Sequence, residues 1–309
     1  MKRIALILNP SAGKGQLLEL LDTITSKLQQ HCEEVTIYQT EKEGDGADKV
    51  REIASEVDLI IAAGGDGTVH ELVNAISALD QPPAFAILPG GTCNDFCRTI
   101  GMDQDPLIAL EQILRKQALD VDVGYSSQGR YFLNFWGIGL ITQVSLSISS
   151  EDKERLGRLA YYFSAAQNIL ETDPFHLEVT VDQKTRFDGE ATLLVVGNGS
   201  FIGGMQGFFP QSRINDSHLD VLILKETSLA SAWSMLLSNW TNDWPESDHL
   251  LYFHTDALTI TASPEQTIDC DGEKGEHTPV DIKVLPKYLT VLVGDLEDSA
   301  LQENTYSVD

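Results

Sequence analysis

Residues 57–68 read Val-Asp-Leu-Ile-Ile-Ala-Ala-Gly-Gly-Asp-Gly-Thr, an apolar run that ends in a glycine-rich loop. An apolar-periodic segment follows at residues 69–79, so the stretch predicts a buried strand, a tight turn and a helix. The three glycines let backbone N–H groups approach an anion, and the helix start adds partial positive charge. The loop is therefore a candidate phosphate site, with Asp66 holding Mg²⁺ and Thr68 contacting phosphate or capping the helix. A turn without a ligand would use the same glycines.

Two further loops follow apolar strands in the same manner. Residues 9–15 read Asn-Pro-Ser-Ala-Gly-Lys-Gly, and residues 88–96 read Leu-Pro-Gly-Gly-Thr-Cys-Asn-Asp-Phe. The first lacks the spacing of a Walker A loop. Strands at 4–8, 35–38, 57–63 and 84–88 alternate with helices at 15–30, 47–55 and 69–79, which predicts a parallel, doubly wound sheet. Because ligands bind at the carboxyl ends of such strands, we expect all three loops to face one crevice.

Beyond about residue 121 the pattern changes to strands with few helices between them. The predicted strands are 131–135, 177–181, 191–197, 219–224, 250–255, 257–261, 280–284 and 289–293, with helix-like insertions at 151–170 and 229–238. This pattern predicts an antiparallel sandwich or barrel. We therefore expect an α/β domain over residues 1–124 and a β-sandwich domain over residues 125–293. The tail at 294–309 either frays or joins the first domain.

Composition excludes several classes of protein. A formal net charge of −26 argues against nucleic acid, whose phosphates are bound by Lys and Arg, and it disfavours attraction to anionic membranes. The apolar run at 4–8 is too short for a secretory signal, and no stretch approaches the roughly 18 apolar residues of a membrane span. The four cysteines lack the spacing of a zinc site or a disulfide framework. A soluble, cytoplasmic protein with reduced thiols is the expectation.

The three loops together resemble the diacylglycerol kinase catalytic family, which includes sphingosine and ceramide kinases. The resemblance continues through Val-Gly-Asn-Gly at 196–199 with Gly203, Gly204 and Pro210, through residues 213–220, and through Asp-Gly-Glu at 271–273. It spans nearly the whole chain and, without an appended regulatory domain, is similar to the soluble bacterial branch. The family implies ATP in a cleft between an α/β domain and a β-sandwich, and transfer of its γ-phosphate, with Mg²⁺, to a diacylglycerol-like lipid to give phosphatidic acid.

The same resemblance implies roles for particular residues. Glu273 would accept the proton of the lipid hydroxyl, with Asp271 beside it and Asp66 in the catalytic centre. Asp216 would ligate a structural Mg²⁺ together with the carbonyls of Arg213 and His218; an imidazole ligand at His218 is the alternative. The positions that would contact ATP are Asn9, Pro10, Ser11, Ala12, Gly13, Thr40, Gly64, Gly65, Asp66, Gly67, Thr68, Val69, His70, Glu71 and Thr92.

These residue types suit phosphoryl transfer, which needs alignment and neutralised phosphate charge more than covalent help. Asp66, Asp95 and Asp122 offer carboxylates for Mg²⁺. Asp271 and Glu273 stand two residues apart, and the residues alone leave open which of them is the base. Asp-Gly is also a common hairpin turn, which is the rival interpretation. The sequence departs from the family in a segment near Asp216, where Ser217 replaces a usual glycine and Ser212 a frequent alanine.

Two other functions stay open. The loop at 64–68 also occurs in NAD kinases, so a kinase of a soluble acceptor is the second hypothesis, although the loop at 9–13 and Asp-Gly-Glu speak against it. A nucleotide- or lipid-binding protein without catalysis is the third hypothesis.

For the lipid kinase we expect transient docking at the inner membrane face, through Lys153, Arg155 and Arg158, unless these residues form only a solvated helix face. The tryptophans at 233, 240 and 244 belong to a core or to that interface. The lipid is not readable from the sequence, and neither is the oligomeric state, for which a homodimer is the commonest closed form.

Overall fold

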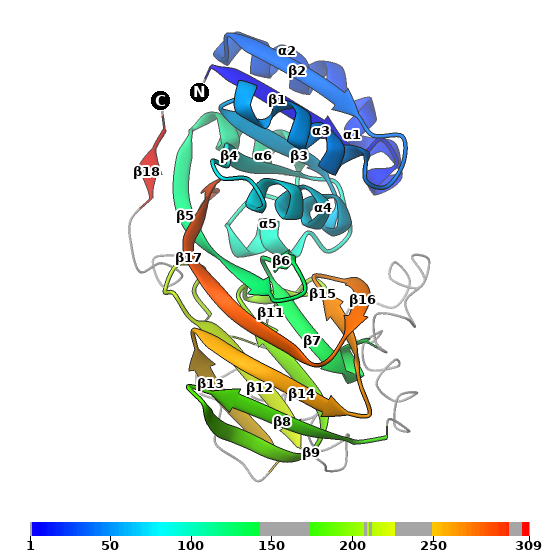
Figure 1. The fold of residues 1–309 in the computed structure, drawn as a ribbon. Helices are drawn as coiled ribbons and strands as arrows, with labels where there is room; N and C mark the ends of the chain where they lie inside the picture. The colour runs from blue at the N-terminus through cyan, green and yellow to red at the C-terminus, as the bar shows by residue number, and fades with distance from the viewer. Residues whose placement is uncertain are drawn as a thin grey trace.

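The computed structural model describes residues 2–142, 173–206, 209, 212–225, 249–296 and 305–308. It has two lobes, an α/β lobe that carries both chain ends and a β lobe, as Figure 1 shows. The predicted helix-like insertions at 151–170 and 229–238, the basic residues Lys153, Arg155 and Arg158, and the three tryptophans near 233–244 lie outside the described residues.

The α/β lobe is built on a parallel sheet, as predicted from the alternating strands and helices. Its strands are β1 (Arg3–Leu8), β2 (Glu34–Gln39), β3 (Leu59–Gly64) and β4 (Ala84–Pro89), paired in the order β2-β1-β3-β4. Its helices are η1 (Ala12–Gly15), α1 (Gln16–Glu19), α2 (Leu21–His31), α3 (Asp45–Ile53), η2 (Ala54–Glu56), α4 (Asp66–Ser77), α5 (Asp95–Thr99) and α6 (Pro106–Leu114). The helix predicted at 15–30 is therefore two helices, α1 and α2.

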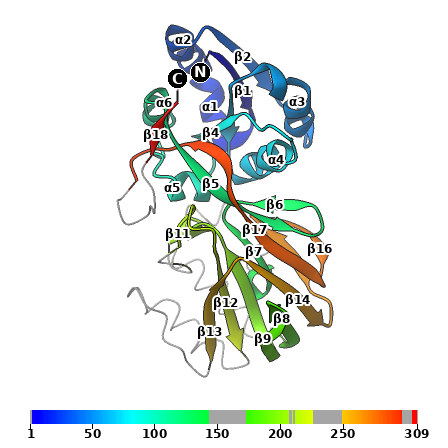
Figure 2. The ribbon, with the colours of Figure 1, turned by 60° about the vertical axis from the view of Figure 1, so that its left-hand side comes forward.

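The order of the strands creates a switch point between β1 and β3. From β1 the chain crosses to β2 on one side, and from β2 it returns past β1 to β3 on the other. Since such crossovers are right-handed, α2 covers one face of the sheet while α3 and α4 cover the opposite face (Figure 2). The crevice at the carboxyl ends of β1 and β3 is where ligands bind in sheets of this kind. The loops at 9–15 and 64–68 lie at this crevice.

The second lobe is antiparallel and forms a sandwich-like β domain, as expected. Its strands are β6 (Arg130–Phe132), β7 (Phe135–Gly139), β8 (Phe175–Val181), β9 (Lys184–Gly197), β10 (Phe201–Ile202), β11 (Met205–Gln206), β12 (Leu219–Lys225), β13 (Leu250–Thr255), β14 (Ala257–Ser263), β15 (Thr267–Cys270) and β16 (Glu273–His277). Antiparallel pairs connect these strands in the order β16-β15-β7-β9-β8-β14. β12 pairs with β9 on the edge opposite β7, and β13 pairs with β12.

Two long strands, β5 (Gln117–Ser126) and β17 (Val280–Leu292), run from one lobe into the other. β17 pairs with β14 in the second lobe and reaches β4 in the first, where Val291 is opposite Phe85. The prediction of two strands at 280–284 and 289–293 was wrong, because a bulge between Leu285 and Leu289 bends one continuous strand. Each lobe has its own apolar core. The boundaries at 124 and 293 stay predictions, since both fall at or near the ends of strands that the lobes share.

The short strand β18 (Tyr306–Ser307) pairs with β5 at Ala118 and Gln117, so this part of the tail lies against the α/β lobe.

Candidate active site

The three glycine-rich loops meet, as the parallel topology predicts. The Asn9 side-chain amide donates to Thr68 Oγ1 at 3.2 Å, which joins the first loop to the second. The backbone N–H of Gly90 donates to the carbonyl of Gly64 at 2.8 Å, which joins the second to the third. Gly13 has φ +57°, and a Cβ atom there would lie 2.4 Å from the Gly90 carbonyl oxygen. Only glycine therefore allows the first and third loops to approach this closely.

Asp66 begins α4 in the middle of this junction. Its carboxylate accepts backbone hydrogen bonds from Asn94 at 2.9 Å and from Asp95 at 2.6 Å, and so anchors the third loop. Burial raises the pKa of Asp66 despite these two donors. The carboxylate of Asp95 in turn accepts hydrogen bonds from the backbone N–H groups of Gly203 and Gly204, which belong to the β lobe. Burial, followed by the negative charge of Asp66, raises the pKa of Asp95 to about 7.

A cleft of about 840 Å³ opens beside these loops, between the two lobes. The sequence-predicted ATP residues in its wall are Asn9, Pro10, Ser11, Thr40, Gly67, Thr68, His70 and Glu71. The other predicted ATP residues, which are Ala12, Gly13, Gly64, Gly65, Asp66, Val69 and Thr92, do not belong to that wall, and Val69 is buried in the apolar core. Glu273 closes the cleft from the β lobe.

The segment Cys270–Glu273 is a hairpin, so the rival interpretation of Asp-Gly is correct and does not exclude a catalytic role. Cys270 pairs with Glu273 across a two-residue loop in which Asp271 has φ +52° and Gly272 φ +92°. Positive φ at both positions is what a tight hairpin turn requires. The turn places Asp271 and Glu273 in different surroundings.

The Asp271 carboxylate points inward and is held by the backbone. It accepts hydrogen bonds from the N–H groups of Leu133, Asn134 and Phe135 at 2.8, 2.9 and 2.8 Å. The prediction of one strand at 131–135 was wrong for this reason. The three N–H groups donate to the carboxylate, so the segment forms two separate strands, β6 and β7. Glu273, in contrast, is exposed, and its Oε1 would lie 3.2 Å from a Cβ atom on Gly67. Its carboxylate therefore lies close to the glycine-rich loop where the two lobes meet.

His70 and Arg130 complete this side of the cleft, and the sequence did not single out Arg130. His70 Nδ1 lies 3.7 Å from Asp271 Oδ2, and both side chains are buried. Arg130 donates to Nε2 of His70 at 3.3 Å. Because a guanidinium has no acceptor, Nε2 is the unprotonated ring nitrogen and Nδ1 carries the hydrogen that faces Asp271. No local motif marks Arg130, since only the pairing of β6 with β5 brings it to the cleft.

The predicted structural metal segment lies at the junction of the lobes as well. Burial and the neighbouring charge of Asp220 raise the pKa of Asp216, and burial and the charge of Asp216 raise the pKa of Asp122. The His218 backbone N–H donates to Asp216 Oδ1 at 3.0 Å, and His218 Nδ1 contacts the Asp216 carbonyl at 2.7 Å. This contact engages Nδ1 and says nothing of Nε2, so both a carbonyl ligand and an imidazole ligand at His218 stay predictions.

These surroundings fit a hard cation. Closely spaced carboxylates gain from a divalent charge, and Mg²⁺ accepts carboxylate, carbonyl and water oxygens. In the described part of the chain, no three His, Cys, Asp or Glu side chains converge on one ion position. Most ligands of an ion at Asp216 would therefore be carbonyls and water.

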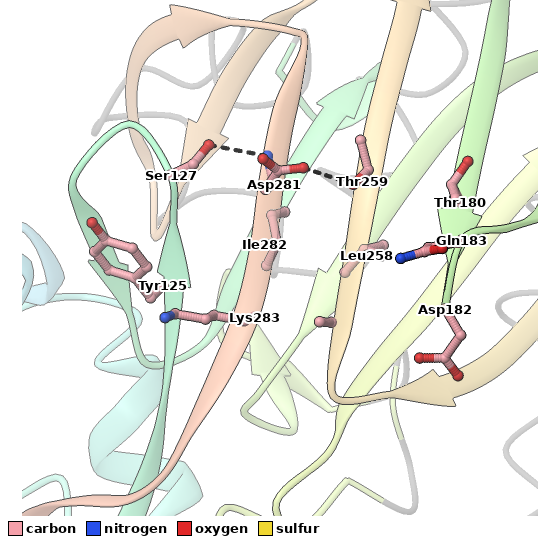
Figure 3. Close-up of a pocket in the computed structure, with 11 residues that line it drawn as sticks. Tyr125, Ser127, Thr180, Asp182, Gln183, Leu258, Thr259, Asp281, Ile282 and Lys283 are labelled. Carbon is pink, nitrogen blue, oxygen red and sulfur yellow. Dashed lines mark hydrogen bonds between the residues drawn. The ribbon is translucent and has the colours of Figure 1, made fainter.

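A smaller pocket of about 440 Å³ lies on the β lobe, over β5, β17, β14 and the β8-β9 turn (Figure 3). Its wall includes Tyr125, Thr259 and Lys283, with the Lys283 ammonium 5.5 Å from the centre of the Tyr125 ring. None of the sequence-predicted site residues lines it, so the predicted chemistry belongs to the larger cleft. Among the described residues, no helix is long and apolar enough to cross a membrane.

Glycine-rich loops on one wall of a cleft and an exposed carboxylate on the other are the parts that a phosphotransferase requires. Comparison with known protein families supports the same class of enzyme. The diacylglycerol kinase catalytic domain family matches residues 3–126, and the family described as YegS C-terminal NAD kinase beta sandwich-like domain matches residues 142–293. The chain therefore belongs to the diacylglycerol kinase family and is an ATP-dependent kinase.

Relatives match over almost their full length. The diacylglycerol kinase of Bacillus subtilis (strain 168) is 31% identical over 295 residues, which cover 95% of this chain and 97% of the relative. The crystal structure of a diacylglycerol kinase from Bacillus anthracis str. Sterne superposes with a TM-score of 0.82 at 35% identity, covering 95% of this chain and 97% of that one. An NAD kinase from Archaeoglobus fulgidus, solved in complex with ATP, has a TM-score of 0.52 at 10% identity, covering 95% and 94% of the two chains, and shares the fold alone.

Proposed function

We propose that this enzyme transfers the γ-phosphate of ATP, with Mg²⁺, to the hydroxyl of a diacylglycerol-like lipid, giving phosphatidic acid. The observation that carries the proposal is the position of Glu273, which is exposed, lines the cleft and lies close to Gly67 of the glycine-rich loop. A base must lie within hydrogen-bond reach of the attacking hydroxyl, and the phosphoryl group must lie beside both. A hydroxyl that enters the cleft next to Glu273 and the loop would meet both conditions.

Glu273 acts as the base in this proposal, and Asp271 as its support. The Glu273 carboxylate takes the hydroxyl proton while the hydroxyl oxygen forms a bond to the γ-phosphorus; the bond from that phosphorus to the bridging oxygen breaks, and ADP leaves. Asp271 is less suited to this role, because both of its oxygens already accept backbone hydrogen bonds. Its three bonds instead hold the hairpin that presents Glu273.

The α/β lobe supplies the nucleotide site. In the proposal the loops at 9–13 and 64–71, with Thr40 and Thr92, hold ATP, and the backbone N–H groups at the start of α4 face its phosphates. Asp66 and Asp95 are buried together, and the hydrogen bonds that their carboxylates accept in the described part of the chain come from backbone N–H groups. Their raised pKa values indicate a position that a cation would stabilise. Mg²⁺ bound there would neutralise phosphate charge. A second ion would be held by Asp216 and the carbonyls of Arg213 and His218.

The relatives named as diacylglycerol kinases support a lipid acceptor. Because such a lipid stays in the bilayer, we expect a cytoplasmic enzyme that touches the inner membrane face transiently. The net charge of −26 opposes attraction to an anionic surface, so contact would depend on a local basic or apolar patch.

The test is transfer of labelled phosphate from ATP, with Mg²⁺, to a panel of acceptors in mixed micelles. The panel contains diacylglycerol, monoacylglycerol, sphingosine, ceramide, phosphatidylglycerol and undecaprenol, with NAD as the soluble control. We expect label on diacylglycerol, and its loss with a chelator and in Asp66→Ala and Glu273→Ala. Label on NAD alone would replace the proposal by a soluble acceptor, and ATP binding without any transfer would favour a binding protein.

A further inference from the structure

Arg130 is a cation held at the junction of the two lobes. It opens β6, which lies between α4 and the β15-β16 hairpin in Figure 1, and its side chain is 19% exposed. One guanidinium nitrogen donates to the Glu276 carboxylate at 2.9 Å and to the Glu273 carbonyl at 3.4 Å. The other donates to His70 Nε2 at 3.3 Å. The guanidinium is therefore fixed from both lobes.

The guanidinium has donors left for an anion in the cleft. Its three contacts among the described residues use three of the five N–H groups that an arginine carries. A Cβ atom on Gly275 would lie 3.2 Å from it, so it also packs closely on the backbone of β16. Because its position is set before any ligand arrives, little side-chain entropy remains to be lost when an anion binds.

The other basic residues in the wall of the cleft lie elsewhere. Lys42 precedes α3 and is close in sequence to Thr40, while Arg51 lies in the last turn of α3 and is paired with Asp48 at 2.7 Å. Lys274 follows Glu273 but donates to the carbonyl of Thr142. Among the described lysines and arginines that line the cleft, Arg130 is the one in contact with the Glu273 segment.

We propose that Arg130 binds the γ-phosphoryl group of ATP and stabilises its charge during transfer. The assignment rests on the proposed function, since it takes Glu273 as the base. An acceptor hydroxyl in reach of the Glu273 carboxylate places the phosphorus within about 3–3.5 Å of that hydroxyl. The phosphoryl group then lies in the cleft next to Glu273 and Gly67, beside a guanidinium that is hydrogen-bonded to the carbonyl of Glu273 itself. A planar fork of N–H donors matches phosphate oxygens, and a fixed cation stabilises charge that develops in the transition state.

Glu276 has a matching role as the partner that orients Arg130 while the cleft holds no triphosphate. Its side chain is 37% exposed, so the pair is accessible to solvent and an anion can compete for the guanidinium. If the pair served only to brace β6 against β16, removing either member would have the same effect. If Arg130 binds phosphate, removing the two members would have opposite effects on nucleotide binding.

The experiment compares calorimetric binding of the β,γ-imido analogue of ATP with binding of ADP, both with Mg²⁺. For Arg130→Ala we expect the analogue to bind about 10–100-fold more weakly, because the variant loses a charge-assisted hydrogen bond to the γ-phosphate. ADP has no γ-phosphate, so it should bind within about threefold of the wild type. Arg130→Lys should fall between the two, since it keeps the charge and loses the fork. Glu276→Gln should bind the analogue at least as tightly as the wild type.

The controls separate a binding role from a structural one. Arg186→Ala removes an arginine that lies over the Phe253 ring on the β lobe, and it should change neither affinity. Equal losses for both nucleotides in Arg130→Ala, or parallel losses in Arg130→Ala and Glu276→Gln, would overturn the assignment in favour of a brace. If the alanine variant does not fold, Arg130→Lys provides the same comparison. Wild-type protein that binds neither nucleotide would overturn the proposed kinase function, and this assignment with it.

Discussion

The Asp66 carboxylate lies 2.6 Å from the backbone nitrogen of Asp95, and the two acids share one buried junction. Asp66 holds the loop that contains Asp95, and Asp95 holds the backbone of Gly203 and Gly204 in the other lobe. Two carboxylates from two loops thus connect the glycine-rich loops to the β lobe. Burial is the main reason that both pKa values are raised; the charge of Asp271 raises the pKa of Asp66 further, and the charges of Asp66 and Asp271 raise that of Asp95.

This junction predicts how the free energy of unfolding depends on pH. Asp95 has a pKa of about 7 in the folded protein against an ordinary value of 3.8, so the folded state holds the proton more tightly. The contribution of this protonation to the free energy of unfolding is fully present below pH 3.8 and is lost as the pH rises through about 7. In urea unfolding with a chelator, we expect the wild type to lose stability between pH 5 and pH 8.

Asp95→Asn should flatten that dependence, because it removes the charge that becomes costly at high pH. The raised pKa of Asp66 has the same sign, so some dependence should remain in the variant. If the wild type and Asp95→Asn lose stability with the same slope between pH 5 and pH 8, the assignment of the effect to this junction is wrong.

Asp271 and Glu273 should respond differently to removal of their charges. In Glu273→Gln we expect kcat to fall by about 10²–10⁴ with little change in stability, since an exposed base is lost from the cleft. In Asp271→Asn one acceptor oxygen becomes an NH₂ group that faces backbone donors, and we expect a loss of about 1–3 kcal/mol in the free energy of unfolding.

Thermal unfolding and steady-state kinetics on the same two preparations check this contrast. A Glu273→Gln enzyme with near-wild-type kcat would remove Glu273 as the base. An Asp271→Asn protein as stable as the wild type would show that its three backbone hydrogen bonds contribute little.

Local sequence patterns were sufficient to predict the positions of the glycine-rich loops. An apolar strand, glycines and a helix start occur within residues 59–77, and parallel strands bring such loops to one edge whatever the rest of the chain does. The strand β5 was missed because Asp120 and Asp122 interrupt its apolar residues. Asp122 is nevertheless fully buried, since its carboxylate accepts hydrogen bonds from the backbone of Ser217 and Lys287, far away in the sequence.

The rest of the site depends on contacts of this long-range kind. Arg130 reaches the cleft through the pairing of β6 with β5, and Asp95 meets Gly203 and Gly204 across the lobes. Neither contact leaves a periodic pattern near the residue itself. The same holds for Asp271, whose role in ending β6 depends on a register between residues 133–135 and a hairpin more than a hundred positions later.

Ser217 offers a stabilising substitution in the predicted metal segment. It stands where the family usually has glycine, and its φ of +65° is the left-handed conformation that L-residues adopt at a cost. We expect Ser217→Gly to raise the free energy of unfolding by ~0.5–1 kcal/mol, after the larger entropy loss of glycine is subtracted. The N–H bond from position 217 to Asp122 would be kept.

Ser212→Gly is the matched control, because Ser212 lies in the same segment without a positive φ. Its hydroxyl donates to the Asn198 carbonyl at 3.2 Å, so glycine there should lower stability. Urea midpoints that move in the same direction for both variants would contradict the strain assigned to Ser217.

Alanine substitutions at Gly13 and Gly44 distinguish the cost of backbone strain from the cost of a clash between loops. Both have positive φ, +57° and +89°, so alanine should cost each about 1 kcal/mol from conformation alone. A Cβ atom on Gly44 meets nothing within 4 Å, whereas one on Gly13 lies 2.4 Å from the carbonyl oxygen of Gly90. Since that neighbour is backbone, no side-chain rotation can relieve the clash. We expect Gly13→Ala to lose a further 1–3 kcal/mol or so beyond Gly44→Ala.

The same pair of variants tests whether the junction of the first and third loops matters for the nucleotide. Pushing residue 13 away from Gly90 also displaces Asn9 and Ser11, which line the cleft, so KM for ATP should rise in Gly13→Ala more than in Gly44→Ala. Urea unfolding gives the stability difference, and initial rates at varied ATP give KM. Equal losses of stability in the two variants would mean that the first loop can move away from the third at no cost. In that case the close approach at Gly90 would not be what holds the three loops around the cleft.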